Sequence, residues 1–220
     1  MNINTQAGSP AAPVCGPAGE LTECAGKFRL LGRLLAAPPD AVLLEDVRSL
    51  GWTGPEDAAA LEDLQVEYTR LFSAPGPAAV PAHQSIYTDV LRLRASEPAA
   101  NSCGAFPGGE FKGYLGGESC SEAGRWYAAA GFRPRDPAPA MADHISTQLD
   151  FLAHLYWLEA QARSRPEDAR YARELRGEFF SRFTGRWAAA FCAKIATNDV
   201  SDFYRSVGRI LSIALDAAKA

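Results

Sequence analysis

Residues 143–164 read DHISTQLDFLAHLYWLEAQARS, and this stretch predicts a long, largely buried α-helix. At about 100° per residue, one set of its apolar side chains falls within roughly 60° of the helix circumference. That set is Ile145, Leu149, Leu152 and Tyr156. Neighbouring positions that widen the apolar face are Phe151, Leu155 and Leu158. We therefore expect a central helix with Ile145, Leu149 and Leu152 buried, and with Asp143 as its N-cap.

The segments on either side show the same helical periodicity. Apolar residues of one segment form a continuous stripe that ends before the breaker cluster at residues 73–77: Leu61, Leu64, Tyr68, Leu71 and Phe72. Further helices are expected over residues 21–36, 40–50, 55–72, 85–94, 121–130 and 166–183, with two more marked by Trp187, Phe191 and Ile195 and by Phe203, Val207, Ile210 and Ala214. No segment shows strand alternation. We expect an all-α, single-domain bundle of about eight or nine helices without a β-sheet.

Two stretches are not expected to contribute to the core of this bundle. Residues 1–20 are rich in alanine, proline and glycine, so we expect a disordered N-terminal tail, followed by a helical domain over residues 21–220. Within that domain, residues 95–119 contain Pro98, Pro107 and six glycines. These residues predict a Gly/Pro-rich irregular loop or insertion.

The composition argues against several classes of function. The net charge of −4 does not suit nucleic acid or an anionic membrane, which attract a basic protein face. No stretch of about 18 apolar residues could span a membrane, and the N-terminus does not read as a secretory signal. The five cysteines are odd in number and contain no CxxC pair, which favours a reducing compartment. We therefore expect a cytoplasmic protein.

The sequence contains no catalytic or phosphate-binding motif of the GxSxG, HExxH or GxxxxGK[ST] type. Its three histidines are His83, His144 and His154. The last two are separated by about 280° around a helix, so they cannot ligate one metal as an i, i+4 pair would. We expect no catalytic residue, metal or cofactor, and we expect His154 at the solvent or at the rim of the core.

Three segments stand out by their residue types. They are Glu67–Phe72 (EYTRLF) before a proline-rich loop, Pro81–Tyr87 (PAHQSIY), and the start of the helix, Asp143–Leu152. Each has an ordinary structural explanation: Tyr68, Leu71 and Phe72 as core residues, the prolines as a connector, and Asp143 as a cap.

Together and in this order, the three segments resemble the redox-enzyme maturation chaperones of the TorD/DmsD/NarJ superfamily, over roughly residues 21–215. A later pair, Phe203-Tyr204, also fits. The resemblance implies a chaperone that binds the twin-arginine signal peptide, the apo form, or both, of a molybdopterin-dependent oxidoreductase catalytic subunit until cofactor insertion. The peptide-binding residues that it implies are Tyr68, Leu71, Phe72, Pro81, His83, Ser85, Tyr87, Asp143 and His144. Residues 97–119 depart from the family pattern because they are longer and richer in glycine.

These residue types suit recognition of a basic and apolar peptide. Asp143 offers an acceptor for arginine, His144 a group that titrates near physiological pH, and Leu71 and Phe72 an apolar floor. Two alternatives remain open: a generic helical protein-binding adaptor without a molybdoenzyme client, and an enzyme such as a helical hydrolase or metal oxidase. The chain is expected to be a monomer or a homodimer that neither binds nucleic acid nor inserts into a membrane.

Overall fold

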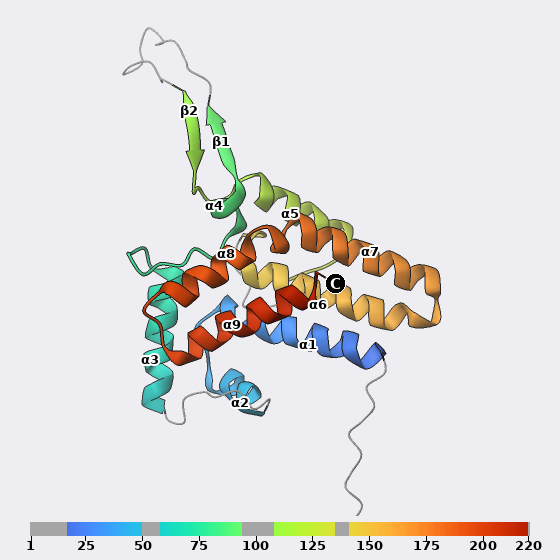
Figure 1. The fold of residues 1–220 in the computed structure, drawn as a ribbon, viewed down its shortest axis with the longest axis horizontal. Helices are drawn as coiled ribbons and strands as arrows, with labels where there is room; N and C mark the ends of the chain where they lie inside the picture. The colour runs from blue at the N-terminus through green and yellow to red at the C-terminus, as the bar shows by residue number, and fades with distance from the viewer. Residues whose placement is uncertain (1–16, 50–57, 94–107, 135–140, 220) are drawn as a thin grey trace, which may run out of the picture.

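The structure is a computed structural model that describes residues 17–49, 58–93, 108–134 and 141–219. Within these ranges the chain forms nine α-helices, two short helical turns and two strands (Figure 1). The helices are α1 (Pro17–Ala36), α2 (Ala41–Ser49), α3 (Ala58–Tyr68), α4 (Gln84–Thr88), α5 (Glu118–Ala129), α6 (Ile145–Gln161), α7 (Pro166–Arg182), α8 (Thr184–Thr197) and α9 (Asp202–Ala217). The turns are the π-helical η1 (Thr69–Ser73) and the 3-10 turn η2 (Ala162–Ser164). The predicted all-α, single-domain bundle is confirmed.

Helix α6 is the centre of the bundle, where it packs between α1 and α7 (Figure 1). The predicted core residues Ile145, Leu149 and Leu152 are fully buried. Helix α1 approaches α6 closely at Gly32, where an added Cβ would lie 3.1 Å from the carbonyl oxygen of Ser146. This position therefore favours glycine, because a side chain would push the two helices apart.

The helix boundaries follow local signals. Asp40 caps α2 by accepting a hydrogen bond from the Leu43 amide at 2.7 Å. Pro166 begins α7, and Ser201 is the N-cap of α9, where its side chain accepts a hydrogen bond from the Tyr204 amide. Helix α1 begins at Pro17, four residues before the predicted start, and residues 1–16 of the predicted tail lie outside the described residues.

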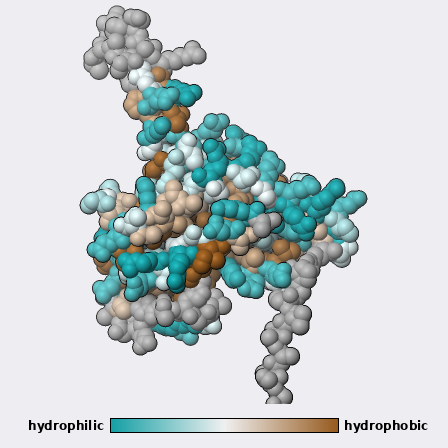
Figure 2. Space-filling model, viewed as in Figure 1, coloured by the Kyte–Doolittle hydropathy of each residue, from teal (hydrophilic) through white to brown (hydrophobic). Residues whose placement is uncertain are grey.

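A small β-ribbon corrects the prediction that the chain has no sheet. Strands β1 (Val90–Leu93) and β2 (Gly109–Lys112) pair antiparallel, with Leu91 opposite Phe111 and Arg92 opposite Glu110. The ribbon stands out from the helices (Figure 1), and exposed apolar side chains lie along it (Figure 2). Residues 90–93 were predicted to continue the helix from Ser85, and residues 109–112 to be irregular. A strand of four residues is too short to show a clear periodicity of apolar side chains, and its pairing with a distant segment leaves no signal in the local sequence.

Asp89 fixes the base of this ribbon. The chain leaves α4 at Asp89, whose carboxylate accepts hydrogen bonds from the backbone amide and the hydroxyl of Ser119, each at 2.9 Å. Ser119 lies in the first turn of α5, so one carboxylate joins the residue before β1 to the helix after β2. The remainder of the predicted loop, residues 95–107, lies outside the described residues.

Candidate functional site

The second and third sequence segments meet at the start of α6. The Gln84 amide donates to the carbonyl oxygen of Asp143 at 3.0 Å, and the Ile145 amide donates to the carbonyl oxygen of Ala82 at 2.8 Å. His83 and His144 form the antiparallel bridge between the two segments. The end of the proline-rich loop, residues 81–85, is therefore held against residues 143–145 at the start of the central helix. These two paired segments are called the strap.

Asp143 is fully buried at this strap, and its role differs from the predicted one. Its Oδ2 accepts a hydrogen bond from the Ser85 amide at 2.9 Å, so the carboxylate caps the first turn of α4 rather than that of α6. The N-cap of α6 is His144, whose Nδ1 accepts a hydrogen bond from the Ser146 amide. The prediction that Asp143 caps the central helix is wrong, because His144 occupies the N-cap position of α6 and Asp143 lies one residue before it.

The second oxygen of the Asp143 carboxylate has a different environment. Oδ1 is buried and has no hydrogen-bond partner among the described residues. A buried carboxylate oxygen without a donor is unfavourable by about 1–3 kcal/mol or more. The Cys120 thiol, a weak donor, interacts with the same carboxylate, so Asp143 keeps an acceptor without a strong donor beneath the loop.

The two histidines of the strap form a T-shaped ring contact, with centroids 4.8 Å apart. Burial lowers the pKa of His144 to about 3; a charge on His83 lowers this pKa further, and Asp143 opposes the shift. Burial also lowers the pKa of His83, against the opposing effect of Asp143. The expectation that His144 changes charge near physiological pH is therefore corrected, because its ring is held neutral in the fold.

The first segment packs on α8 and α9. Tyr68 and Leu71 are buried core residues, and the Tyr68 hydroxyl donates to the carbonyl oxygen of Leu35 at 3.1 Å. Phe72 is half-buried, and its ring lies 5.7 Å from that of Tyr204 and 6.0 Å from that of Phe191. Tyr68 and Phe72 thus hold the end of α3 and the turn η1 on α1, α8 and α9.

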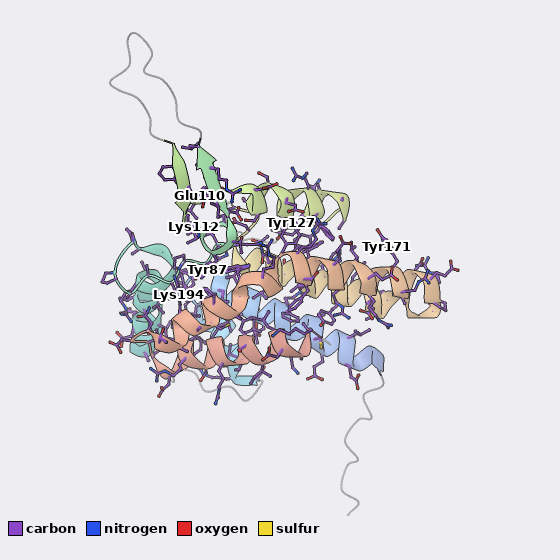
Figure 3. The ribbon with its side chains drawn as sticks, turned by 45° about the horizontal axis from the view of Figure 1, so that its top comes forward. Tyr87, Glu110, Lys112, Tyr127, Tyr171 and Lys194 are labelled. Carbon is purple, nitrogen blue, oxygen red and sulfur yellow. The ribbon has the colours of Figure 1, made fainter. Side chains whose placement is uncertain are left out.

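An aromatic chain along α8 connects the first segment to the strap. The ring of Phe72 contacts that of Phe191, and the Phe191 ring contacts that of Trp187, with centroids 5.8 Å apart. The Trp187 ring in turn contacts that of Tyr87, with centroids 5.0 Å apart. The Tyr87 hydroxyl donates to the Pro81 carbonyl oxygen at 2.9 Å, and Lys194 Nζ lies 5.0 Å from the Tyr87 ring (Figure 3). Burial raises the pKa of Tyr87 well above its usual value, so it remains a neutral donor.

The predicted site residues divide into two groups by exposure. Phe72, Pro81, His83 and Tyr87 are half-buried and can be reached from the surface. The buried members are Tyr68, Leu71, Ser85, Asp143 and His144. The second and third segments therefore meet at the strap, whereas the acceptor Asp143 lies below the surface.

A buried amide network was missed in the sequence analysis, although its members lie in or next to the quoted motifs. The Gln148 side-chain amide donates to Oε1 of Gln84 at 2.6 Å, and the Trp187 indole donates to Oε1 of Gln148 at 3.0 Å. The network joins α4, α6 and α8 behind the strap. Glutamines at buried positions of both motifs were the available signal, since a buried amide needs a partner.

The described residues contain no group of three or more His, Cys, Asp and Glu side chains that could hold a metal ion. Among the same residues, no helix is long and apolar enough to cross a membrane. The Cys120 thiol lies close to Asp143, and burial raises its pKa, which disfavours the reactive thiolate. The geometry defines a helical domain with a strapped loop and a partly exposed aromatic chain.

The geometry defines the class of all-helical, single-domain proteins, and comparison with known families identifies the chain further. The model of the nitrate reductase delta subunit family matches residues 35–193, which include all three segments. The chain therefore belongs to this family, a NarJ/TorD-type family of molybdoenzyme maturation chaperones rather than of catalysts. No curated protein and no solved structure matches the chain.

Proposed function

We propose that this protein binds the twin-arginine signal peptide of a molybdopterin-dependent oxidoreductase catalytic subunit in the cytoplasm and holds the apo form until its cofactor is inserted. The family match supports a molybdoenzyme client. The observation that supports the peptide-binding role is the buried Oδ1 of Asp143 beneath the loop, which has no strong hydrogen-bond donor among the described residues.

An arginine side chain supplies what this carboxylate lacks. A guanidinium group donates from several N–H groups in a fixed plane and bonds a carboxylate more strongly than a neutral donor does. Oδ2 of Asp143 is already used by Ser85, so the arginine would bond Oδ1 alone. Because Asp143 is fully buried, the loop around half-buried His83 has to move aside first.

The half-buried aromatic residues suit the apolar stretch that follows the arginines in such a signal. Phe72 and Tyr87 lie at the two ends of the aromatic chain on α8. Rings held by their neighbours lose little conformational freedom when a peptide docks, which leaves more of the apolar burial as binding free energy.

Co-purification tests the proposed client. The tagged protein is isolated from cells that make molybdopterin oxidoreductases, with and without a block in molybdenum cofactor synthesis. A catalytic subunit should co-purify, and its amount should rise when the block keeps it in the apo form. Absence of any molybdoenzyme subunit under both conditions would contradict the proposal and favour a generic adaptor.

A further inference from the structure

An open groove lies between α3 and the loop that follows η1. It has a volume of about 1140 Å³. One wall is the exposed face of α3 and η1, and the other is the loop that follows η1. The lining residues are Pro38, Glu62, Gln65, Val66, Thr69, Arg70, Ala74, Pro75, Gly76, Pro77 and Ala78.

The groove has an apolar floor. Val66 is 69% exposed, although the opposite face of the same helix is buried in the core. Small apolar residues and prolines of the loop line the same groove. An exposed valine facing apolar loop residues forms a surface that gains free energy when another apolar group covers it.

The loop wall is held in place by hydrogen bonds. The Val80 amide donates to the carbonyl oxygen of Leu71 at 2.7 Å, and the Ala79 amide to that of Gly76 at 3.1 Å. The Asn198 side chain donates to the carbonyl oxygen of Ala78 at 2.7 Å. Proline also restricts the backbone of the loop. The groove therefore exists before a partner binds, which reduces the ordering cost of docking.

The charges around the groove favour a ligand that carries a positively charged side chain. Glu62 lines it and Asp63 follows directly; both are exposed, and neither forms an ion pair with a described residue. Arg70, the one cation among the described lining residues, donates to the carbonyl oxygen of Asp199, and its Nη2 lies 3.8 Å from Oε1 of Glu67. The positive charge is thus engaged, while the Glu62 carboxylate remains available at the edge of the apolar floor.

We infer that this groove binds an apolar segment of the client chain that is flanked by a cationic residue. The apolar residues cover Val66 and the proline wall, and the cation pairs with Glu62. The inference rests on the proposed function, because it assigns a second contact surface for the same client. It does not require Asp143 to become exposed, and a segment without paired arginines is sufficient.

The test uses fluorescently labelled synthetic peptides and anisotropy titration of the full chain. One probe is a run of leucine, alanine and serine flanked by a single lysine, and its partner carries glutamate in place of lysine. The wild-type protein should bind the lysine probe about threefold more tightly than the glutamate probe, as expected for an exposed ion pair.

Substitution at the floor should remove this binding. Val66→Arg places a charge on the apolar surface and should weaken binding of the lysine probe by about tenfold or more. Because Val66 is exposed on a helix and arginine is a good helix former, the fold should be retained. The matched control is Val42→Arg on α2, outside the groove, where the valine is 67% exposed; its affinity should equal that of the wild type.

Reversing the charge at Glu62 should reverse the preference of the protein for the lysine probe over the glutamate probe. Glu62→Lys should bind the glutamate probe more tightly than the lysine probe. Glu167→Lys, at an exposed site in the first turn of α7, should keep the wild-type preference. Equal binding by Val66→Arg and the wild type would overturn the groove inference.

The outcomes also separate this inference from the proposed function. If the wild type binds a twin-arginine signal peptide but neither apolar probe, the groove inference fails and the proposed function stands. If the wild type binds none of these peptides, both signal-peptide binding and the groove inference fail.

Discussion

The two oxygens of the Asp143 carboxylate lead to a prediction at the residue scale. In Asp143→Asn, the amide oxygen can still accept the Ser85 hydrogen bond, but the charge offered to an arginine is lost. Affinity for a twin-arginine signal peptide should fall by roughly 1–3 kcal/mol. Isothermal titration measures this loss.

Stability provides the control for this substitution. Ile145→Ala removes fully buried atoms from the core and should destabilise the protein by about 2–5 kcal/mol, more than Asp143→Asn does. Unchanged affinity with a large loss of stability in Asp143→Asn would show that the carboxylate is only the cap of α4.

The neutral ring of His144 predicts a pH-dependent stability. Its folded-state pKa, about 3, lies below the ordinary value of 6.5, so unfolding takes up a proton between these values. The stabilisation is complete above pH about 6.5 and is lost as the pH falls toward about 3. His144→Asn keeps a capping side chain but does not titrate. Between pH 7 and pH 4.5, the free energy of unfolding measured in urea should fall by roughly 2–3 kcal/mol more in the wild type than in the variant. Parallel pH profiles would contradict this assignment.

At the scale of elements, two aspartates cap helices from a distance. Asp143 caps α4, and Asp89 caps α5 while it closes the base of the ribbon. Asp89→Ala leaves the Ser119 amide without its acceptor and should destabilise the protein by about 1–2 kcal/mol. Hydrogen exchange should show reduced protection in the first turn of α5. Asp216→Ala, which removes only an exposed pair with Lys219, should change stability by less than about 0.5 kcal/mol.

Sequence information was sufficient for elements whose signal is local. The stripe containing Ile145, Leu149 and Leu152 repeats within one helix, and all three residues are buried as predicted. The ribbon was missed because Leu91 pairs with Phe111 across a separate stretch of chain. Four residues contain too few positions to distinguish a strand from a helix end.

The candidate site was predictable only in part for the same reason. The motifs identified the segments at Pro81 and Asp143, and the structure joins them through His83 and His144. The sequence could not reveal which helix Asp143 caps, because an aspartate that caps its own helix and one that caps a distant helix have the same local pattern. The groove around Val66 depends on the path of the following loop, which no periodicity predicts.

At the scale of the whole molecule, one charge cluster ties α6 to α7. Glu159 is 2% exposed and accepts hydrogen bonds from Arg173 and Arg176, at 2.8 and 3.0 Å. Arg176 also lies over the Tyr156 ring. Glu159→Gln leaves this partly buried guanidinium without its counter-charge and should destabilise the fold by about 3 kcal/mol in urea unfolding. The control is Glu174→Gln in the exposed pair of Glu174 and Arg170, which should change stability by less than about 1 kcal/mol. Equal effects of the two substitutions would mean that Glu159 does not stabilise the packing of α6 on α7.

The N-terminal boundary of the domain gives a last prediction at this scale. Helix α1 begins at Pro17, and the residues that pack α1 onto α6, such as Phe28 and Leu31, lie well inside it. A deletion of residues 1–16 keeps all of α1, so the melting temperature should shift by less than about 2 °C. Binding of the peptide probes should also stay unchanged, since the residues that the structure describes at the strap and the groove all lie between Pro38 and Ile145. A fall of several degrees would show that the segment packs on the bundle, and a loss of binding alone would show that it belongs to the peptide-binding surface.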